Sequence, residues 1–336
     1  MKGHSRIARR IISFVIAVVA ALAAVIAVLT AGHATQVNPG VAQAGEPWAA
    51  PYYYLGVDGP PPAQVMMATG VHRFTLAFIV SDGSCSPAWD RPDLLTGTAE
   101  EDAIRGIRAA GGDVAVSFGG MGGTKLAVTC SSPETLAGAY QKVVSAYRLR
   151  AIDLDVEGTE VGSAVLRQRI ISALIILRQR DPGLMISVTI GAEPTGPDAD
   201  GRDLIMRAAA DGLRVDAWTI MPFDFSVNVP DMGQASVQAA EALKNDLMSA
   251  FHESASAAYQ TMGISSMNGR TDTGEVIRVA DFETILRYTQ AHHLARLAFW
   301  SVNRDRRCMP GSTADSCSGI AQAPYAFTRT IAGYRG

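Results

Sequence analysis

Three acidic residues, Asp153, Asp155 and Glu157, alternate with apolar residues in one short run of the sequence. Successive side chains of a β-strand point to opposite faces, so an extended stretch over 151–158 would bring the three carboxyl groups to one face. Carboxyl groups that converge in a buried interior repel one another, and some must be protonated or hydrogen-bonded. Folding alone does not require this pattern, so we interpret it as a catalytic acid–base site. The alternatives are a divalent-cation site with oxygen ligands and an incidental, solvated strand face.

Short runs rich in apolar, β-branched and aromatic residues recur along the chain and predict strands. They cover 53–57, 73–80, 113–118, 151–156, 185–190, 215–221, 261–267 and 296–302. Most are separated by segments with apolar residues at three-to-four spacing, which is typical of amphipathic helices. These helical segments cover 100–110, 132–148, 161–179, 201–211, 232–254 and 280–292.

Strands that alternate with helices indicate parallel βα units, and eight of them over this length predict a (β/α)8 barrel. The acidic face would then line the lumen. A solvated acidic face is disfavoured, because central parallel strands are buried on both faces. A doubly wound open sheet is the alternative fold, but Gly59-Pro60-Pro61-Pro62 after the first strand is not a glycine-rich phosphate loop.

The composition limits the class of protein. The chain has 336 residues, of which 48% are hydrophobic and 18% charged, with a formal net charge of −3. Such a composition excludes a disordered chain. It also excludes a polybasic protein that binds nucleic acid, because positive charge is not in surplus.

The N-terminus has the pattern of an export signal. Arg6, Arg9 and Arg10 precede an uncharged run over 11–45, and possible cleavage sites after Ala34 and Ala44 favour removal of the segment. We therefore divide the chain into a signal peptide or signal anchor (1–34), a linker (35–50) and one barrel domain (51–336). We expect the protein to be secreted, or to be anchored in the membrane by an uncleaved N-terminus with its barrel outside.

Four cysteines, an even number, are consistent with disulfides in an exported chain. Three pairings are possible, and we favour Cys85–Cys130 and Cys308–Cys317 because each would tie loops at one end of neighbouring elements. No His-Glu-x-x-His motif or paired-cysteine spacing is present in the sequence, so we expect no metal site.

The acidic strand resembles the catalytic strand of glycoside hydrolase family 18, the chitinases and their relatives. The family pattern Asp-x-x-Asp-x-Asp-x-Glu is matched at its last three positions, whereas the first position is Arg150. A Ser-x-Gly-Gly motif expected on the third strand is present as Ser117-Phe118-Gly119-Gly120. A Met-x-Tyr-Asp motif expected on the sixth strand is partly kept as Met221-Pro222-Phe223-Asp224.

Two further segments are similar to a bacterial and archaeal chitinase subgroup that carries a Trp-Ser-x-Asn-Arg-Asp signature. One is the end of the eighth strand, residues 299–305, which reads FWSVNRD. The other is residues 85–89, CSPAW, after the second strand. The resemblance runs from about Pro51 to Cys308 and again implies a (β/α)8 barrel.

The resemblance implies a role for each matching residue. Glu157 would be the general acid, and the substrate's own 2-acetamido group would replace an enzyme nucleophile. Asp155 would orient that acetamide and stabilise the charged intermediate, while Asp153 would share a proton with Asp155. The substrate-binding set would be Asp224, Trp300, Met221, Phe223 and Trp89. Ser117, Gly119 and Gly120 would shape the barrel interior without being catalytic.

The implied function is an exported glycosidase, a chitinase that cleaves β-1,4-linked N-acetylglucosamine polymers with retention and without a cofactor. Another N-acetylglucosamine-containing glycan is an open alternative as the substrate. A non-catalytic, lectin-like chitin-binding barrel is the second alternative, because Phe223 lacks the hydroxyl of the family tyrosine. The presence of Glu157 argues against the lectin, since such relatives usually lose the acid.

Overall fold

The computed structural model describes residues 48–336 except 58, 91–98, 226, 228 and 335. The chain divides into two compact units, 1–38 and 39–336, and the first lies wholly outside the described residues. The predicted signal segment (1–34) and most of the predicted linker (35–50) therefore fall outside the description. Within the described part of the chain, no helix is both long and apolar enough to cross a membrane.

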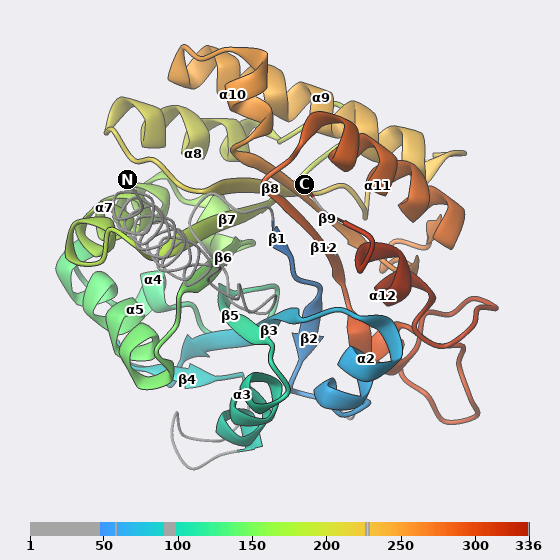
Figure 1. Ribbon diagram of the computed structural model, residues 1–336. Helices are drawn as coiled ribbons and strands as arrows, with labels where there is room; N and C mark the ends of the chain where they lie inside the picture. Colours follow the sequence, from blue (N-terminus) through green and yellow to red (C-terminus); the bar gives the residue numbers. More distant parts are fainter. Residues whose placement is uncertain (1–47, 58, 91–98, 226, 228, 335) are drawn as a thin grey trace, which may run out of the picture. The chain divides into compact units, whose positions relative to one another are not determined.

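A curled sheet of parallel strands forms the centre of the barrel domain (Figure 1). Hydrogen-bonded neighbours follow the order β1-β12-β9-β8-β7-β6-β5-β3-β2. The strands are β1 (Trp48–Ala49), β2 (Tyr52–Tyr54), β3 (Arg73–Ser81), β5 (Asp113–Gly119), β6 (Ala151–Val156), β7 (Met185–Gly191), β8 (Ala217–Met221), β9 (Met262–Met267) and β12 (Arg296–Trp300). All eight predicted strands are present, with boundaries shifted by a few residues.

The first barrel strand is split in two and closes the barrel. β1 pairs with β12, and β2, which follows after Ala50 and Pro51, pairs with β3. The Ala50 N–H donates to the Leu297 carbonyl at 3.2 Å, and the Thr75 N–H donates to the Pro51 carbonyl at 3.0 Å. Proline has no N–H for a ladder, so the strand changes partner at this residue. The strand begins at Trp48, inside the predicted linker.

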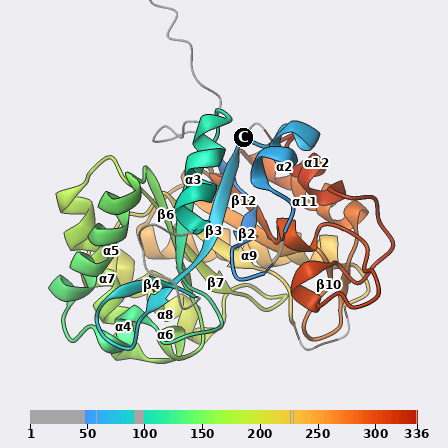
Figure 2. The same cartoon turned by 90° about the horizontal axis from the view of Figure 1, so that it is seen from below.

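Helices cover the outer face of the sheet (Figures 1 and 2). The longer ones are α2 (Pro62–Thr69), α3 (Ala99–Ala109), α5 (Pro133–Tyr147), α7 (Ala164–Arg180), α8 (Ala199–Ala210), α9 (Met232–Phe251) and α11 (Val279–His292). Shorter ones are α4 (Leu126–Thr129), α6 (Thr159–Gly162), α10 (Ala255–Tyr259) and α12 (Ala326–Ile331). The six predicted helices are confirmed. α2 was not predicted, although its first residue, Pro62, is well suited to a first helical turn.

The lumen of the barrel is filled by layers of side chains. A small apolar cluster forms one layer, from Trp48, Ala50, Ala115, Ala151 and Met185. A second cluster consists of Tyr52, Ala77, Phe78 and Ala298. A buried polar network connects Thr75, Ser117, Asp153, Ser187, Thr189, Thr219 and Arg296. Filled layers are the rule for barrels of this size, but a charged layer is unusual because buried charges must be paired.

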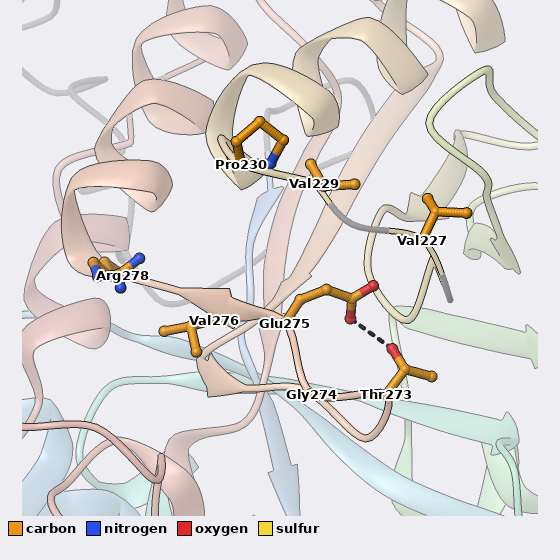
Figure 3. A pocket seen from close by; sticks show the side chains of 8 residues that line it. All are labelled: Val227, Val229, Pro230, Thr273, Gly274, Glu275, Val276 and Arg278. Atoms are coloured by element: carbon orange, nitrogen blue, oxygen red, sulfur yellow. Dashed lines mark hydrogen bonds between the residues drawn. The ribbon is translucent and has the colours of Figure 1, made fainter.

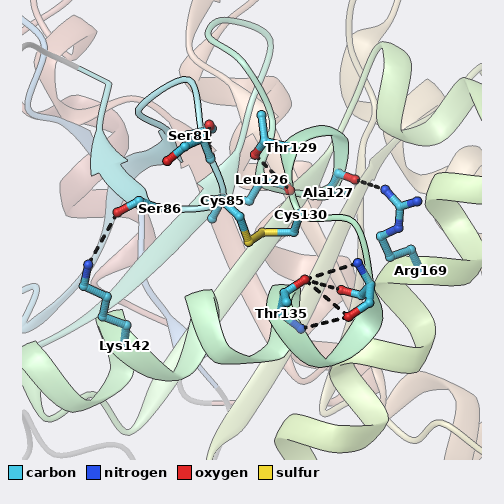
Figure 4. Close-up of a disulfide and its surroundings, with 12 residues drawn as sticks. Ser81, Cys85, Ser86, Leu126, Ala127, Thr129, Cys130, Thr135, Lys142 and Arg169 are labelled. Carbon is cyan, nitrogen blue, oxygen red and sulfur yellow. Dashed lines mark hydrogen bonds between the residues drawn. A yellow bond between two sulfur atoms is a disulfide. The ribbon is translucent and has the colours of Figure 1, made fainter.

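Both predicted disulfides are confirmed. Cys85 follows β3 and is bonded to Cys130, which ends α4 (Figure 4). Cys308 and Cys317 close a short loop after β12. The first bridge joins segments that follow two neighbouring barrel strands, and it therefore ties together the rim at the carboxyl ends of β3 and β5.

Removing the Cys85–Cys130 bridge with paired serine substitutions should lower the free energy of unfolding by about 4 kcal/mol. The bridge joins residues 45 positions apart, so its loss frees a long loop in the unfolded chain. The Cys308–Cys317 bridge spans 9 positions and should contribute only about 3 kcal/mol. Denaturant unfolding of both double variants measures the two losses. A larger loss for the shorter loop would contradict the loop-entropy argument.

Candidate active site

The acidic strand β6 has the alternation that the sequence predicts. Ile152, Leu154 and Val156 belong to the core between the sheet and the helices. Asp153 is fully buried, and its hydrogen bonds to residues of β2, β5, β7 and β12 place it in the lumen. Glu157 follows the strand and is only partly buried. The strand thus carries its carboxyl groups from the closed interior towards the mouth of the barrel.

Asp153 accepts hydrogen bonds from four side chains. Its Oδ2 accepts from the hydroxyls of Tyr52 and Ser117, each at 2.7 Å. Its Oδ1 accepts at 2.7 Å from the Thr189 hydroxyl and from Nη1 of Arg296. In the described structure no hydrogen bond joins Asp153 to Asp155, so the shared proton implied by the resemblance has no geometric support here.

Asp155 is buried and keeps an oxygen available. Its side chain is 3% exposed, and Oδ1 has no hydrogen-bond partner among the described residues. Burial raises the pKa of Asp155 well above its usual value, and the neighbouring Glu157 and Asp153 raise it further. Asp155 therefore holds a proton readily, and its free oxygen can accept a donor from a bound molecule.

Glu157 is poised to exchange a proton near neutral pH. Burial raises its pKa to about 7, and the negative charges of Asp224 and Asp272 act in the same direction. The positive charge of Lys125 opposes them. A carboxyl group with this pKa can donate a proton in one step and accept it back in the next.

Glu160 has a pKa of about 7 as well, again because of burial. It lies three residues after Glu157 and lines a small cavity together with Phe118 and Leu154, which face the helices. A raised pKa alone therefore does not tell which of the two glutamates is the candidate acid. Glu157 is the candidate because it lies at the end of the series of acids that face the lumen.

Lys125 is a buried cation that sequence analysis did not identify as a site residue. Its Nζ donates to the carbonyls of Gly119, Gly120 and Gly122. The lysine is thereby fixed next to the exit of β5, where its charge lowers the pKa of Glu157.

The Lys125→Met substitution should raise the pKa of Glu157 by roughly half a unit to one unit, because it removes a positive charge that favours the ionised carboxylate. Titration of the Glu157 carboxyl by 13C NMR measures the shift. Lys142→Met is the matched control, because Lys142 is exposed on α5 and contacts Ser86. An unchanged or lower pKa of Glu157 in Lys125→Met would contradict this assignment.

The glycines that follow β5 are required by close contacts. Gly119 has φ of +103°, and a Cβ there would lie 2.2 Å from the carbonyl oxygen of Asp155. Gly120 has φ of +75°, and a Cβ there would meet the ring of Phe78 at 2.8 Å. Any larger residue would push the acidic strand or the aromatic wall out of place.

Trp300 ends β12 and belongs to an aromatic cluster. Its ring stacks on Phe78 with centroids 5.4 Å apart and planes 13° apart. The rings of Tyr52 and Tyr54 are tilted against it, with centroid distances of 5.9 and 5.5 Å. Trp300 is only partly buried, so part of its surface can receive the apolar face of a sugar.

The loop after β8 brings a fourth acidic residue to the mouth. Asp224 has φ of +55°, and its Oδ1 accepts hydrogen bonds from the backbone N–H and the hydroxyl of Thr273. Met221 is buried at the end of β8, and Phe223 is partly buried and packs on the main core. Phe223 brings no hydroxyl to the site.

A pocket of about 730 Å³ adjoins Asp224 through Thr273 (Figure 3). It is lined by Val227, Val229, Pro230, Thr273, Gly274, Glu275, Val276 and Arg278. Glu275 accepts a hydrogen bond from the Thr273 hydroxyl at 2.6 Å. The pocket lies at the carboxyl ends of the strands, the end at which barrel enzymes hold their active sites.

Trp89 does not belong to this site, contrary to the prediction. It lies in β4 (Pro87–Trp89), which pairs antiparallel with β3, and its side chain is 2% exposed. Its indole N–H donates to the Tyr147 hydroxyl of α5 at 2.9 Å. A ring enclosed between β3 and α5 has no face left for a sugar.

The residues after Trp300 in the eighth-strand motif support loops. Asn303 exchanges two hydrogen bonds with the backbone of Tyr54, at 2.8 and 2.9 Å. Arg304 donates to the carbonyls of Asn268, Arg270 and Ala314. Asp305 accepts from Thr328 and Phe327 at the start of α12. These contacts fix the loop that follows Trp300 and touch none of the acidic residues of β6.

Comparison with known proteins points to one group of enzymes. No model of a known protein family matches the chain. The chain is 28% identical over 284 residues to the probable bifunctional chitinase/lysozyme of Escherichia coli, an alignment covering 78% of this chain and 31% of that protein. It is 27% identical over 266 residues to endochitinase 11 of Metarhizium anisopliae, covering 73% of this chain and 50% of that protein.

A solved structure extends the likeness to the fold. Active domain 2 of the thermostable chitinase from Pyrococcus furiosus, a catalytic-site mutant complexed with chito-oligosaccharides, matches with a TM-score of 0.76 at 28% identity. The match covers 84% of this chain and 92% of that one. The predicted (β/α)8 barrel is thereby confirmed. The chain spans half or less of the length of the two curated relatives.

Proposed function

We propose that the chain belongs to the chitinase-like glycoside hydrolase family 18 and is a glycosidase that cleaves β-1,4-linked N-acetylglucosamine polymers. The observation that carries the proposal is the pair formed by Asp155 and Glu157. One has a buried oxygen without a partner, and the other has a pKa of about 7. Trp300 offers a partly exposed ring at the same end of the barrel.

In the proposed mechanism, Glu157 donates its proton to the glycosidic oxygen and the leaving sugar departs. The carbonyl oxygen of the substrate's 2-acetamido group attacks the anomeric carbon, which gives an oxazolinium ion. The acetamide N–H donates to the free oxygen of Asp155. Glu157 is now a carboxylate, and the negative charge held by Asp155 and Glu157 lies next to the oxazolinium cation. A water molecule then gives a proton to Glu157 and attacks the anomeric carbon, its bond to the acetamide oxygen breaks, and the original configuration is restored.

The test is a product assay on the N-acetylglucosamine hexamer, with NMR detection of the anomer formed first. Shorter oligomers released as the β-anomer are expected. Release of the α-anomer would overturn retention, and tight binding without cleavage would indicate the lectin-like alternative. Peptidoglycan is the comparison substrate, because the Escherichia coli relative carries both chitinase and lysozyme in its name.

Export of the protein is part of the proposal. It is supported by the basic start and apolar run of the sequence and by two disulfides, which persist outside the cytoplasm. Fractionation of producing cells and N-terminal sequencing test it. We expect the mature protein outside the cytoplasm with a new N-terminus after Ala34 or Ala44, or with its original N-terminus in the membrane fraction.

A further inference from the structure

A fully buried arginine contacts the innermost acid of β6. Arg296 begins β12, and its side chain has no exposed surface. Its Nη1 donates to Oδ1 of Asp153 at 2.7 Å and to the Thr189 hydroxyl at 2.8 Å. The rings of Trp48 and Tyr52 lie 5.3 Å from its guanidinium carbon. A cation enclosed in this way needs an ionised partner, since an unpaired buried charge is very costly.

The donors around Asp153 leave no place for a further proton. A carboxylate offers about four lone-pair sites, and each oxygen of Asp153 already accepts from two donors. Three of these donors are neutral hydroxyls, and the fourth is the guanidinium of Arg296. A protonated Asp155 therefore finds no free acceptor on Asp153.

The charges in and around the lumen can be assigned group by group. Asp153 forms an ion pair with Arg296 at 2.7 Å, and the negative charge of the one cancels the positive charge of the other. The other titratable groups that act on this part of the site are Tyr52, Asp155, Glu157, Lys125, Asp224 and Asp272. Lys125 and the last two acids belong to the mouth and not to the Asp153 network.

We propose that Arg296 is a positioning residue: it holds Asp153 as a permanent carboxylate and thereby confines the mobile proton to Asp155 and Glu157. The effect of this positioning role on catalysis rests on the proposed function. The arrangement departs from the proton shared between the two aspartates that the family resemblance implies. In this chain a fixed cation takes the place of that proton.

The position of the proton is measurable in the unmutated protein without substrate. With Asp carboxyl carbons labelled by 13C, the Asp153 signal is identified by its absence from Asp153→Asn. Over the pH range in which the Asp155 signal moves, the Asp153 signal should keep the shift of a carboxylate. An Asp153 signal that moves together with that of Asp155 would show a shared proton and overturn the proposal. This measurement does not depend on the folding of a variant at Arg296.

Two substitutions distinguish the effect of the charge of Arg296 from the effect of its packing. Arg296→Lys keeps the cation, and the Asp153 signal should stay fixed. Arg296→Gln removes it, so Asp153 should take up a proton and titrate, with a loss of kcat of about 100-fold and an additional ionisation in the kcat–pH profile. If Arg296→Gln is only less stable and keeps the unmutated profile, Arg296 is merely structural and the proposal fails.

Failure of the proposed function gives a different result. A protein that cleaves no N-acetylglucosamine polymer but shows a fixed Asp153 signal refutes the glycosidase and leaves the proton assignment standing. A protein that cleaves these polymers while Asp153 titrates refutes the role of Arg296 alone.

Discussion

Replacing Glu157 with Gln is expected to lower kcat on N-acetylglucosamine oligomers by about 10³-fold while the protein stays folded. Glutamine has nearly the same shape, but it has no proton to give to the leaving oxygen and cannot deprotonate water afterwards. In the unmutated protein, activity should fall as pH rises above about 7, because Glu157 then loses the proton that it must donate. The residual activity of Glu157→Gln should lack this basic limb. Oligomer release over a pH series measures both effects.

Glu160→Gln is the matched control for this experiment. The substitution is the same, the residue lies three positions away, and its pKa is also about 7. Because Glu160 faces the helix layer, kcat should stay within about threefold of the unmutated value. Equal losses in the two variants would mean that the fold, and not proton transfer, accounts for the effect of Glu157→Gln.

The second large effect is expected for Asp155→Asn, with kcat and kcat/KM both lower by about 10²- to 10³-fold. An asparagine oxygen can still accept the acetamide N–H, so binding of the substrate should change little. The amide cannot carry the negative charge that stabilises the oxazolinium ion, so the loss should appear in the transition state. Steady-state kinetics on the hexamer, combined with calorimetric binding, separates the two contributions.

Asp272→Asn controls for the loss of one negative charge near the site, because Asp272 is exposed on the loop between β10 (Gly269–Arg270) and β11 (Val276–Ile277). Its kcat at the optimal pH should stay within about threefold of the unmutated value. If Asp155→Asn instead weakened binding as much as it lowered kcat/KM, Asp155 would be a ground-state binding residue.

The barrel could be predicted from the sequence because most of its strands and helices have a local pattern of apolar residues. The apolar runs at 73–80 and 151–156 became β3 and β6 with few changes at their ends. β1 was missed because a strand of two residues before Pro51 has no periodicity to read. α2 was missed because it follows a Pro-rich segment and is too short for a clear amphipathic pattern.

The acids of the site could be predicted for the same reason, since alternation along one strand is a local property. The side chains that hydrogen-bond to these acids could not be predicted from the sequence. Arg296 contacts an acid 143 residues away, and Tyr52 contacts the same acid over 101 residues. A single arginine or tyrosine at the start of a strand does not indicate such a partner. Trp89 was wrongly placed because a motif position does not tell which side of a strand its ring will occupy.

Closure of the barrel through β1 has a consequence for how the protein folds. Trp48 pairs with Arg296, so the first strand finds its partner only after the last strand has been made. Such distant pairings form slowly, because a long loop must be closed before the contacts stabilise it. Arg296 is also the cation that pairs with Asp153, so β6 has its counter-ion only when β12 is in place. In a chain whose last strand has not yet joined the sheet, Asp153 therefore lacks its buried counter-ion.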